Sequence, residues 1–370
     1  MLRRTLLQLA ISGVAERLRA ASQSPGGNTT KKLVLVTIGG IRRQESFSPK
    51  GIVHIPHLMS DLLPQSLFFP YTVNEGVTSH FNTIASIITG VWQHVDDCGG
   101  QKPSDPTLFQ YLQSQLGLNA RDTWVVSSNK QLTANISAGV NVILSKQLMI
   151  EAVERIILGR GRKQLERDQL LTEMRTVLDA DYERIGWGIP SASSFQSPEV
   201  RQTLVAGLES FIHGPDAPAT GDELTFLIGR EVLQHLSPAM LMMNFSDVEV
   251  AHVGSYALHL GGIRRADLLC FRLWQFIQAS PELRGRTTLV ILDEFGRDPD
   301  GSSTNGFFNH RTNTESCRMA WSIVLGPAVK KPEVVERVVR QIDIAPSIAS
   351  WMGIDCSQAK GSPLPEIVVS

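Results

Sequence analysis

Residues 33–38 form a nearly continuous run of aliphatic and β-branched side chains that ends abruptly at Gly39 and Gly40. A strand that is buried on both faces has this pattern, because neither face needs polar side chains. Such strands belong to parallel sheets that are covered by helices on both sides. The run therefore predicts a buried parallel strand of an α/β fold, followed by a tight loop.

Strand-like and helix-like segments alternate along much of the remaining chain. Strand character occurs at residues 67–69, 123–127, 239–245, 287–292 and 320–325. Helical spacing occurs at residues 83–89, 107–115, 254–280 and 342–352. Strands that alternate with helices indicate a mostly parallel sheet with helices on both faces, which is a three-layer α/β domain.

Two parts of the chain differ in composition from this alternation of strands and helices. Residues from about 145 to 237 combine helical spacing with dense charge and Gly/Pro-rich breaks, so we interpret them as a helical insertion in one domain of residues 31–370. Residues 1–30 contain a double arginine at Arg3 and Arg4, a short apolar run and a linker, and they resemble a twin-arginine export signal. This predicts a bacterial protein exported to the periplasm. Charges that interrupt the apolar run leave an amphipathic N-terminal helix on a cytoplasmic protein as the alternative.

The composition restricts the classes of partner. Lys plus Arg (35) nearly balance Asp plus Glu (36), which gives no electrostatic reason to expect nucleic acid or an anionic membrane. No stretch approaches 18 uninterrupted apolar residues, so no transmembrane span is expected. The four cysteines are far apart and form no C-x-x-C pair, which indicates neither a zinc knuckle nor a redox motif. A small molecule or another protein is the expected partner.

Acidic residues and histidines stand directly beyond the ends of several predicted strands. The candidates follow strands 239–245 and 287–292, or lie in the loop before strand 320–325: Asp247, Glu249, His252, Asp293, Glu294 and His310. In such sheets, ligands bind beyond the carboxyl ends of the strands. Asp, Glu and His are also the zinc ligands of open, water-bearing sites. The sequence therefore predicts a metal site at this edge of the sheet.

Each candidate also has an ordinary structural alternative. Asp247 could cap the helix that follows it, as acidic residues at strand ends often do. Asp293 could belong to a charged surface turn, and His310 could be exposed to solvent in its polar loop. We favour metal binding, because all three alternatives would have to coincide at the edge of the sheet where ligands bind.

At these positions the chain resembles the alkaline phosphatase superfamily, which includes phosphodiesterases, sulfatases and cofactor-independent phosphoglycerate mutases. The resemblance covers most of residues 31–355 outside the insertion. It is carried by residues 36–42, the helix that ends Ile-Ile-Thr-Gly at residues 87–90, the loop 247–252, the strand 287–293, His310 and residues 343–353. It implies an alkaline-phosphatase-like fold. Members of the family usually hold two divalent metals, commonly zinc, near a Thr, Ser or modified Cys nucleophile.

The resemblance implies a first metal site that is complete in this sequence. Its ligands would be His252 and His310 together with Asp247 or Glu249. The family usually places its Asp four residues before this His, and position 248 is Val248, flanked by the two acidic residues. Either neighbour could therefore be the acidic ligand.

The second metal site implied by the resemblance, which includes Asp293, is altered at three positions. Gly39 stands where the family has an acidic residue, Glu294 where it has a histidine, and His80 at the nucleophile position, shortly after Thr78. Glu294 and Glu45 could supply oxygen ligands instead, which would suit harder ions.

Alternatively, one divalent metal binds, with zinc as the leading candidate, and His80 acts as a further ligand, a general base or a nucleophile. Metal-activated water or a nucleophile near Thr78 and His80 would then react, and Arg297 would hold the anionic group. We therefore expect a metal-dependent hydrolase of small phosphate or sulfate esters.

Two other functions remain open on the same residues. The first is a catalytically degraded protein that keeps the fold in a binding or structural role. Loss of an acidic residue, a nucleophile and a histidine together is what drift after loss of chemistry would produce. The second is a phosphotransferase or mutase that uses the same site.

Overall fold

The computed structural model describes residues 31–96, 101–128, 140–145, 220–301 and 306–368. The predicted export signal at residues 1–30 lies outside the described residues, and so does most of the predicted helical insertion. Both stay predictions. Across the described ranges, no helix is both long enough and apolar enough to cross a membrane.

A nine-stranded sheet forms the centre of the described part of the protein, with the strand order β4-β3-β5-β1-β6-β7-β2-β8 and with β9 paired to β2. Its strands are β1 (Lys32–Ile38), β2 (Leu67–Val73), β3 (Thr123–Ser127), β4 (Asn141–Leu144), β5 (Met240–Phe245), β6 (Thr287–Asp293), β7 (Met319–Leu325), β8 (Glu333–Val334) and β9 (Val339–Arg340). Strands β4, β3, β5, β1 and β6 run parallel to one another, whereas β7 runs antiparallel to both β6 and β2. The sheet is therefore mostly parallel, as the sequence predicts.

Strand β1 lies in the interior of the sheet and is paired in parallel with β5 on one side and β6 on the other. Every residue from Leu33 to Ile38 is buried. Alternate side chains enter two different cores, with Val34 and Val36 on one face and Leu33 and Leu35 on the other. Burial on both faces explains why this segment carries an almost unbroken apolar run.

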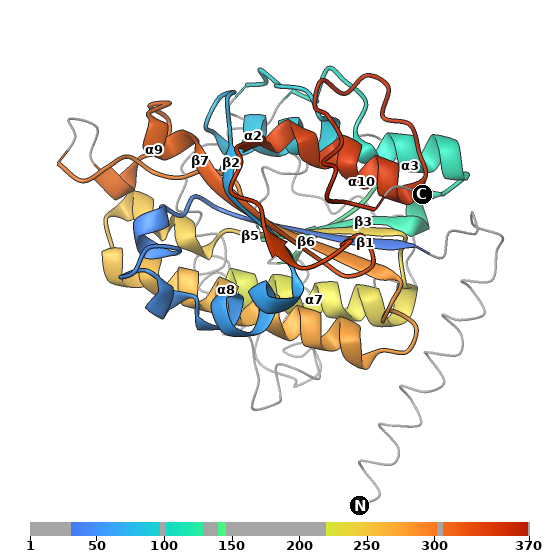
Figure 1. The fold of residues 1–370 in the computed structure, drawn as a ribbon, viewed down its shortest axis with the longest axis horizontal. Coiled ribbons are helices and arrows are strands. Elements are labelled where there is room, and N and C mark those ends of the chain that lie inside the picture. Colours follow the sequence, from blue (N-terminus) through green and yellow to red (C-terminus); the bar gives the residue numbers. More distant parts are fainter. Residues whose placement is uncertain (1–30, 97–100, 129–139, 146–219, 302–305, 369–370) are drawn as a thin grey trace, which may run out of the picture.

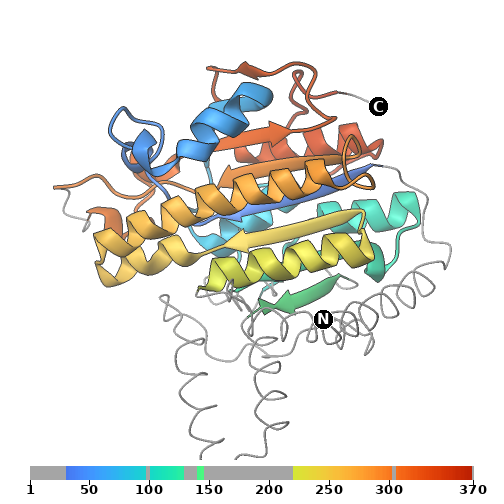
Figure 2. The ribbon, with the colours of Figure 1, turned by 90° about the horizontal axis from the view of Figure 1, so that it is seen from below.

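Helices cover both faces of the sheet and make three layers (Figure 1). One face carries α7 (Gly221–Leu236) and α8 (Tyr256–Ala279), which lie beside each other and run roughly along the strands (Figure 2). The other face carries α2 (His80–Thr89), α3 (Leu108–Leu116) and α10 (Ile344–Met352). The three-layer fold predicted from the sequence is confirmed. Smaller 3₁₀ and π turns, together with the short helix α9 (Glu315–Arg318), occupy the connections.

Helix α7 is the described part of the predicted insertion. It packs against β5, β3 and α8, and its buried apolar side chains, including Leu224, Ile228 and Val232, belong to the core on that face of the sheet. The strand β4, just before the insertion, extends the parallel edge of the sheet beyond β3. The sequence analysis did not predict this strand, which has only four residues.

Candidate metal centre

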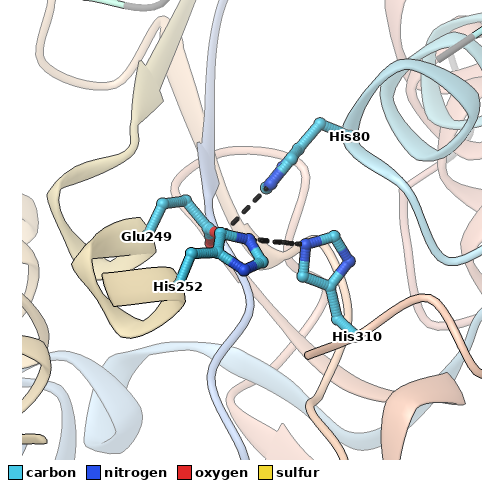
Figure 3. Close-up of side chains that lie close together, drawn as sticks. All are labelled: His80, Glu249, His252 and His310. Atoms are coloured by element: carbon cyan, nitrogen blue, oxygen red, sulfur yellow. Dashed lines mark hydrogen bonds and ion pairs between the residues drawn. The ribbon is translucent and has the colours of Figure 1, made fainter. Parts of the chain in front are cut away.

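Four side chains from three separate segments converge beyond the carboxyl ends of β5, β1 and β6 (Figure 3). They are His80, Glu249, His252 and His310, and one possible ligand atom from each lies within 4.8 Å of all the others. The position is the edge of the sheet at which the sequence analysis placed a metal site. His252 is 20% exposed, and the other three are more deeply buried.

Glu249 and His252 share one face of the short helix η7 (Asp247–Val253), which begins almost directly after β5. This helix is 3₁₀, with three residues per turn, so side chains at positions i and i+3 lie one above the other. Glu249 Oε2 is 3.1 Å from His252 Nε2. The buried His259 donates from Nδ1 to the Val248 carbonyl at 2.8 Å and so supports η7 from α8.

His80 is the first residue of α2 and is held in place by a buried carboxylate. Its Nδ1 is 2.5 Å from Glu294 Oε2, and its Nε2 is 3.3 Å from Glu249 Oε2. Glu294, which directly follows β6, also accepts a hydrogen bond from Asn244 Nδ2 at 2.7 Å. When Glu294 is ionised, it accepts the Nδ1 proton of His80 and leaves the Nε2 lone pair facing the cluster. Metal-binding histidines commonly have this arrangement.

The other two histidines are also fixed by hydrogen bonds from Nδ1. His252 Nδ1 is 2.6 Å from the Phe308 carbonyl, and His310 Nδ1 is 2.9 Å from the Thr78 carbonyl. A carbonyl oxygen can only accept, so each Nδ1 carries a proton and each neutral ring has its lone pair on Nε2. The two Nε2 atoms are nevertheless only 3.0 Å apart. Two lone pairs at this distance repel each other unless a proton or a metal ion lies between them.

The carboxylate of Glu249 is at the centre of the cluster. Its Oε1 accepts the Gly40 N–H at 2.8 Å, and its Oε2 accepts from Arg297 Nη2 at 2.5 Å. Burial alone would raise the pKa of Glu249, but Arg297, together with His80 and His252, outweighs this effect and holds the pKa well below its ordinary value. Glu249 is therefore an anion at neutral pH.

Gly39 provides the space that this carboxylate occupies. A Cβ atom added at Gly39 would lie 2.3 Å from Glu249 Oε1 and 2.9 Å from Val248 Cγ2. The sequence analysis treated Gly39 as a lost acidic position. The structure shows that a carboxylate from η7 fills the space beside it.

The donor set fits a divalent ion of the zinc type. Ligand atoms around a tetrahedral zinc ion lie roughly 3.3 Å apart, given zinc–nitrogen distances of about 2.0–2.1 Å. Glu249 Oε2 is 3.1, 3.3 and 3.9 Å from the Nε2 atoms of His252, His80 and His310. Three imidazole nitrogens and one carboxylate oxygen are typical zinc ligands.

Four other candidate acids lie outside this four-residue cluster: Asp247, Asp293, Glu45 and Glu294. Asp247 Oδ2 instead forms an ion pair with Arg265 at 3.0 Å, so the structure brings Glu249 to the cluster and not its neighbour. Asp293 is fully buried and accepts the Ile41 N–H at 3.1 Å, so it is not part of a surface turn. Burial, with a smaller effect from Glu294, raises the pKa of Asp293 well above its ordinary value.

Glu45, the other possible oxygen ligand of a second site, is engaged with other residues. It forms an ion pair with Arg42 and accepts a hydrogen bond from the Tyr256 hydroxyl at 3.1 Å. Glu294 contacts the cluster through His80. Among the described residues, the structure therefore groups one set of side chains that could hold a metal ion.

The two remaining candidates, Thr78 and Arg297, are buried and hydrogen-bonded within the protein. The Thr78 hydroxyl donates to the His310 carbonyl and lies 3.1 Å from Asn313 Oδ1, which ties the start of α2 to the His310 loop. Arg297 donates to Glu249, to the Gly40 carbonyl at 2.7 Å and to the Phe307 carbonyl at 3.3 Å. The roles of Thr78 near the nucleophile and of Arg297 as an anion clamp stay predictions.

Sequence reasoning missed two features of the site. The first is the contact between Glu249 and the Gly39–Gly40 loop, for which the paired glycines after β1 were the available signal. The second is Phe295, whose fully buried ring stacks on His310 at a centroid distance of 4.1 Å and packs against His80 at 4.8 Å.

Comparison with known proteins supports the fold through structure and not through sequence. No protein-family model and no curated protein sequence matches the chain. The alkaline phosphatase PafA matches with a TM-score of 0.56 and 11% identity over 93% of this chain and 99% of PafA. A member of the alkaline phosphatase superfamily from Vibrio parahaemolyticus matches with a TM-score of 0.53 and 11% identity over 94% of this chain and 77% of its own.

A third match is the phosphonate monoester hydrolase of Agrobacterium radiobacter, with a TM-score of 0.53 and 11% identity over 90% of this chain and 76% of that enzyme. At these identities, the matches establish the three-dimensional arrangement alone. With its mostly parallel sheet and two helical layers, the chain has the alkaline-phosphatase-like fold that the sequence predicts.

Proposed function

We propose that this protein is a metal-dependent hydrolase of small phosphate or sulfate esters, with a divalent ion, zinc first among the candidates, held by His80, Glu249, His252 and His310. The observation that carries the proposal is the His252–His310 pair, whose Nε2 atoms are 3.0 Å apart while both Nδ1 atoms are bonded to carbonyls. A bound cation removes the repulsion between the two lone pairs.

A bound zinc ion would lower the pKa of coordinated water to roughly 7 and stabilise negative charge on an ester oxygen. The residues of the chain prepare this chemistry by fixing the ligands. Glu294 orients His80, and backbone carbonyls orient His252 and His310. The partly exposed His252 marks the side from which a small anion can approach. Two structural neighbours are by name an alkaline phosphatase and a phosphonate monoester hydrolase, which supports an ester hydrolase.

The proposal is tested by metal analysis and activity on the same purified samples. The wild type is expected to retain stoichiometric zinc or a similar ion and to hydrolyse at least one of an aryl phosphate, an aryl phosphodiester or an aryl sulfate. The His252→Ala/His310→Ala double variant should lose both. His57→Ala is the matched control, because His57 lies outside the cluster and pairs with Asp61. Absence of metal and of all three activities in the wild type would refute the proposal.

A second candidate function is a non-catalytic role in which the ion is structural. The burial of three of the four ligands favours it, because structural zinc sites use four protein ligands and catalytic sites keep a position for water. In that case the wild type would bind the ion without hydrolysing any ester, and the double variant would lose thermal stability together with the metal.

Product analysis in the presence of an alcohol acceptor would distinguish a phosphotransferase from a hydrolase.

A further inference from the structure

The guanidinium of Arg297 lies beside the proposed metal site, in contact with the same oxygen atom that faces the three histidines. Nη2 of Arg297 is 2.5 Å from Glu249 Oε2. This oxygen also lies 3.1 Å from His252 Nε2 and 3.3 Å from His80 Nε2. A carboxylate oxygen has two lone pairs, so Oε2 can bind one guanidinium and one ion at once.

Arg297 is anchored independently of this carboxylate. Its Nε donates to the Gly40 carbonyl at 2.7 Å, and its Nη1 donates to the Phe307 carbonyl at 3.3 Å. The Gly40 peptide nitrogen in turn donates to Glu249 Oε1. The guanidinium is therefore fixed by the loop after β1 and by the His310 loop, and its side chain is fully buried. It would keep its position when an ion binds.

Most of the groups that could hold a second ion have other partners. Glu249 Oε1 is taken by the Gly40 N–H, and the adjacent Gly39 has no space for a side chain of its own. Glu294 binds His80 and Asn244, and Asp293 Oδ1 accepts the Ile41 N–H. The buried Asp293 Oδ2 has no hydrogen-bond partner among the described residues, and a single oxygen is too few ligands to hold an ion. The fixed positive charge next to Glu249 further disfavours a second cation, because like charges at this distance in a buried site repel strongly.

We propose that Arg297 is the permanent second cation of this centre, so that the protein binds a single divalent ion that shares Glu249 Oε2 with the guanidinium. The proposal rests on the proposed metal site and deepens it. Arg297 would hold Glu249 in place before the ion arrives, and its charge would lower the affinity for that ion. An arginine in this role positions a metal ligand and does not contact the substrate.

The test compares zinc binding by the wild type, Arg297→Met, Arg297→Lys and Arg42→Met, measured by competition with a chromophoric chelator and by metal analysis after dialysis. Arg42 is the matched control, because it is also buried and its buried ion pair is with Glu45, which is not one of the four ligands. The wild type should bind one zinc ion per chain. Arg297→Met should bind zinc at least tenfold more tightly, whereas Arg297→Lys and Arg42→Met should stay within about threefold of the wild type, given the repulsion between like charges.

The single-ion inference and the proposed function would fail with different experimental results. Two zinc ions per wild-type chain, or an Arg297→Met affinity no tighter than that of Arg42→Met, would overturn the inference while leaving the metal site standing. If the wild type binds no zinc, the proposed function fails. In that case the inference still requires that Arg297→Met binds zinc and that Arg42→Met does not. If neither variant binds zinc, the inference is overturned as well.

The loss of a buried counter-ion can also prevent folding. If Arg297→Met is insoluble, refolding with zinc should recover it, because the ion would replace the lost positive charge. If zinc does not restore folding of Arg297→Met, but the Glu249→Gln/Arg297→Met double variant folds, the inference is wrong. This result would show that a bound ion cannot replace the positive charge of the guanidinium beside Glu249. Failure of the double variant as well would mean that Arg297 is required for reasons other than the charge of Glu249, which also overturns it.

Discussion

A methyl group added at Gly39 should displace the carboxylate in the middle of the candidate metal centre. In Gly39→Ala the new Cβ would lie 2.3 Å from Glu249 Oε1, so the carboxylate must move away from the Gly40 N–H. Overpacking a buried position costs about 1–3 kcal/mol. Weakening a hydrogen bond to a charged group adds about 1.5–3 kcal/mol. We expect the free energy of unfolding to fall by about 2.5–6 kcal/mol.

Urea denaturation followed by tryptophan fluorescence measures this change, because the chain has six tryptophans and Trp321 is buried in the core. Gly261→Ala is the control, since a Cβ there meets nothing within 4 Å and should be neutral or stabilising by up to about 1 kcal/mol in its helix. In a Glu249→Ala background, Gly39→Ala should cost at least about 1 kcal/mol less than in the wild type, because the clashing carboxylate is gone. Equal stability of Gly39→Ala and wild type would refute the assignment of Glu249 to this space.

Three further predictions concern the support of the site and the rest of the fold. Glu294→Gln should weaken metal binding by about 10–100-fold, measured by chelator competition, because it removes the carboxylate that orients His80; unchanged affinity would contradict this. Phe295→Ala should cost about 3–5 kcal/mol in urea denaturation and loosen His310, since the ring is fully buried against it; a loss below about 1 kcal/mol would count against this packing. Burial raises the pKa of Asp267 from 3.8 to about 6, so between these pH values the folded state binds more protons than the unfolded state. The free energy of unfolding should therefore fall by up to about 3 kcal/mol as the pH rises from about 4 to 6. Asp267→Asn should abolish that part of the pH dependence, and an unchanged slope in urea midpoints would show that another group causes it.

The layered fold could be predicted because its central strands are buried on both faces. Strands of this kind are almost entirely apolar, which made residues 33–38 and 287–292 recognisable without any knowledge of their neighbours. Helix α2 was predicted to start at Thr83, whereas it begins at His80. Its first turn carries His80 and Asn82, whose buried polar side chains interrupt the apolar pattern because His80 bonds Glu294 and Asn82 bonds the Val95 carbonyl.

The residues of the candidate metal site could be predicted only in part. Glu249, His252 and His310 stand beyond strand ends, where a general rule places ligands, and the structure brings them together with His80. The rule could not choose between Asp247 and Glu249, because the choice depends on which face of η7 points to β1. The contacts of Glu249 with Gly40 and Arg297 depend on the strand order β5-β1-β6, which single residues do not reveal.

X-ray absorption at the zinc edge of the zinc-loaded full-length protein tests the central claim most directly. The account predicts one tightly held ion with three imidazole nitrogens at about 2.0–2.1 Å and one carboxylate oxygen at about 2.0–2.2 Å, and a loss of imidazole scattering in His252→Ala/His310→Ala. A fifth, water-derived oxygen would accord with the hydrolase, and a closed four-ligand site would favour the structural role. A spectrum without imidazole scattering, or a protein that retains no ion after dialysis, would contradict the account.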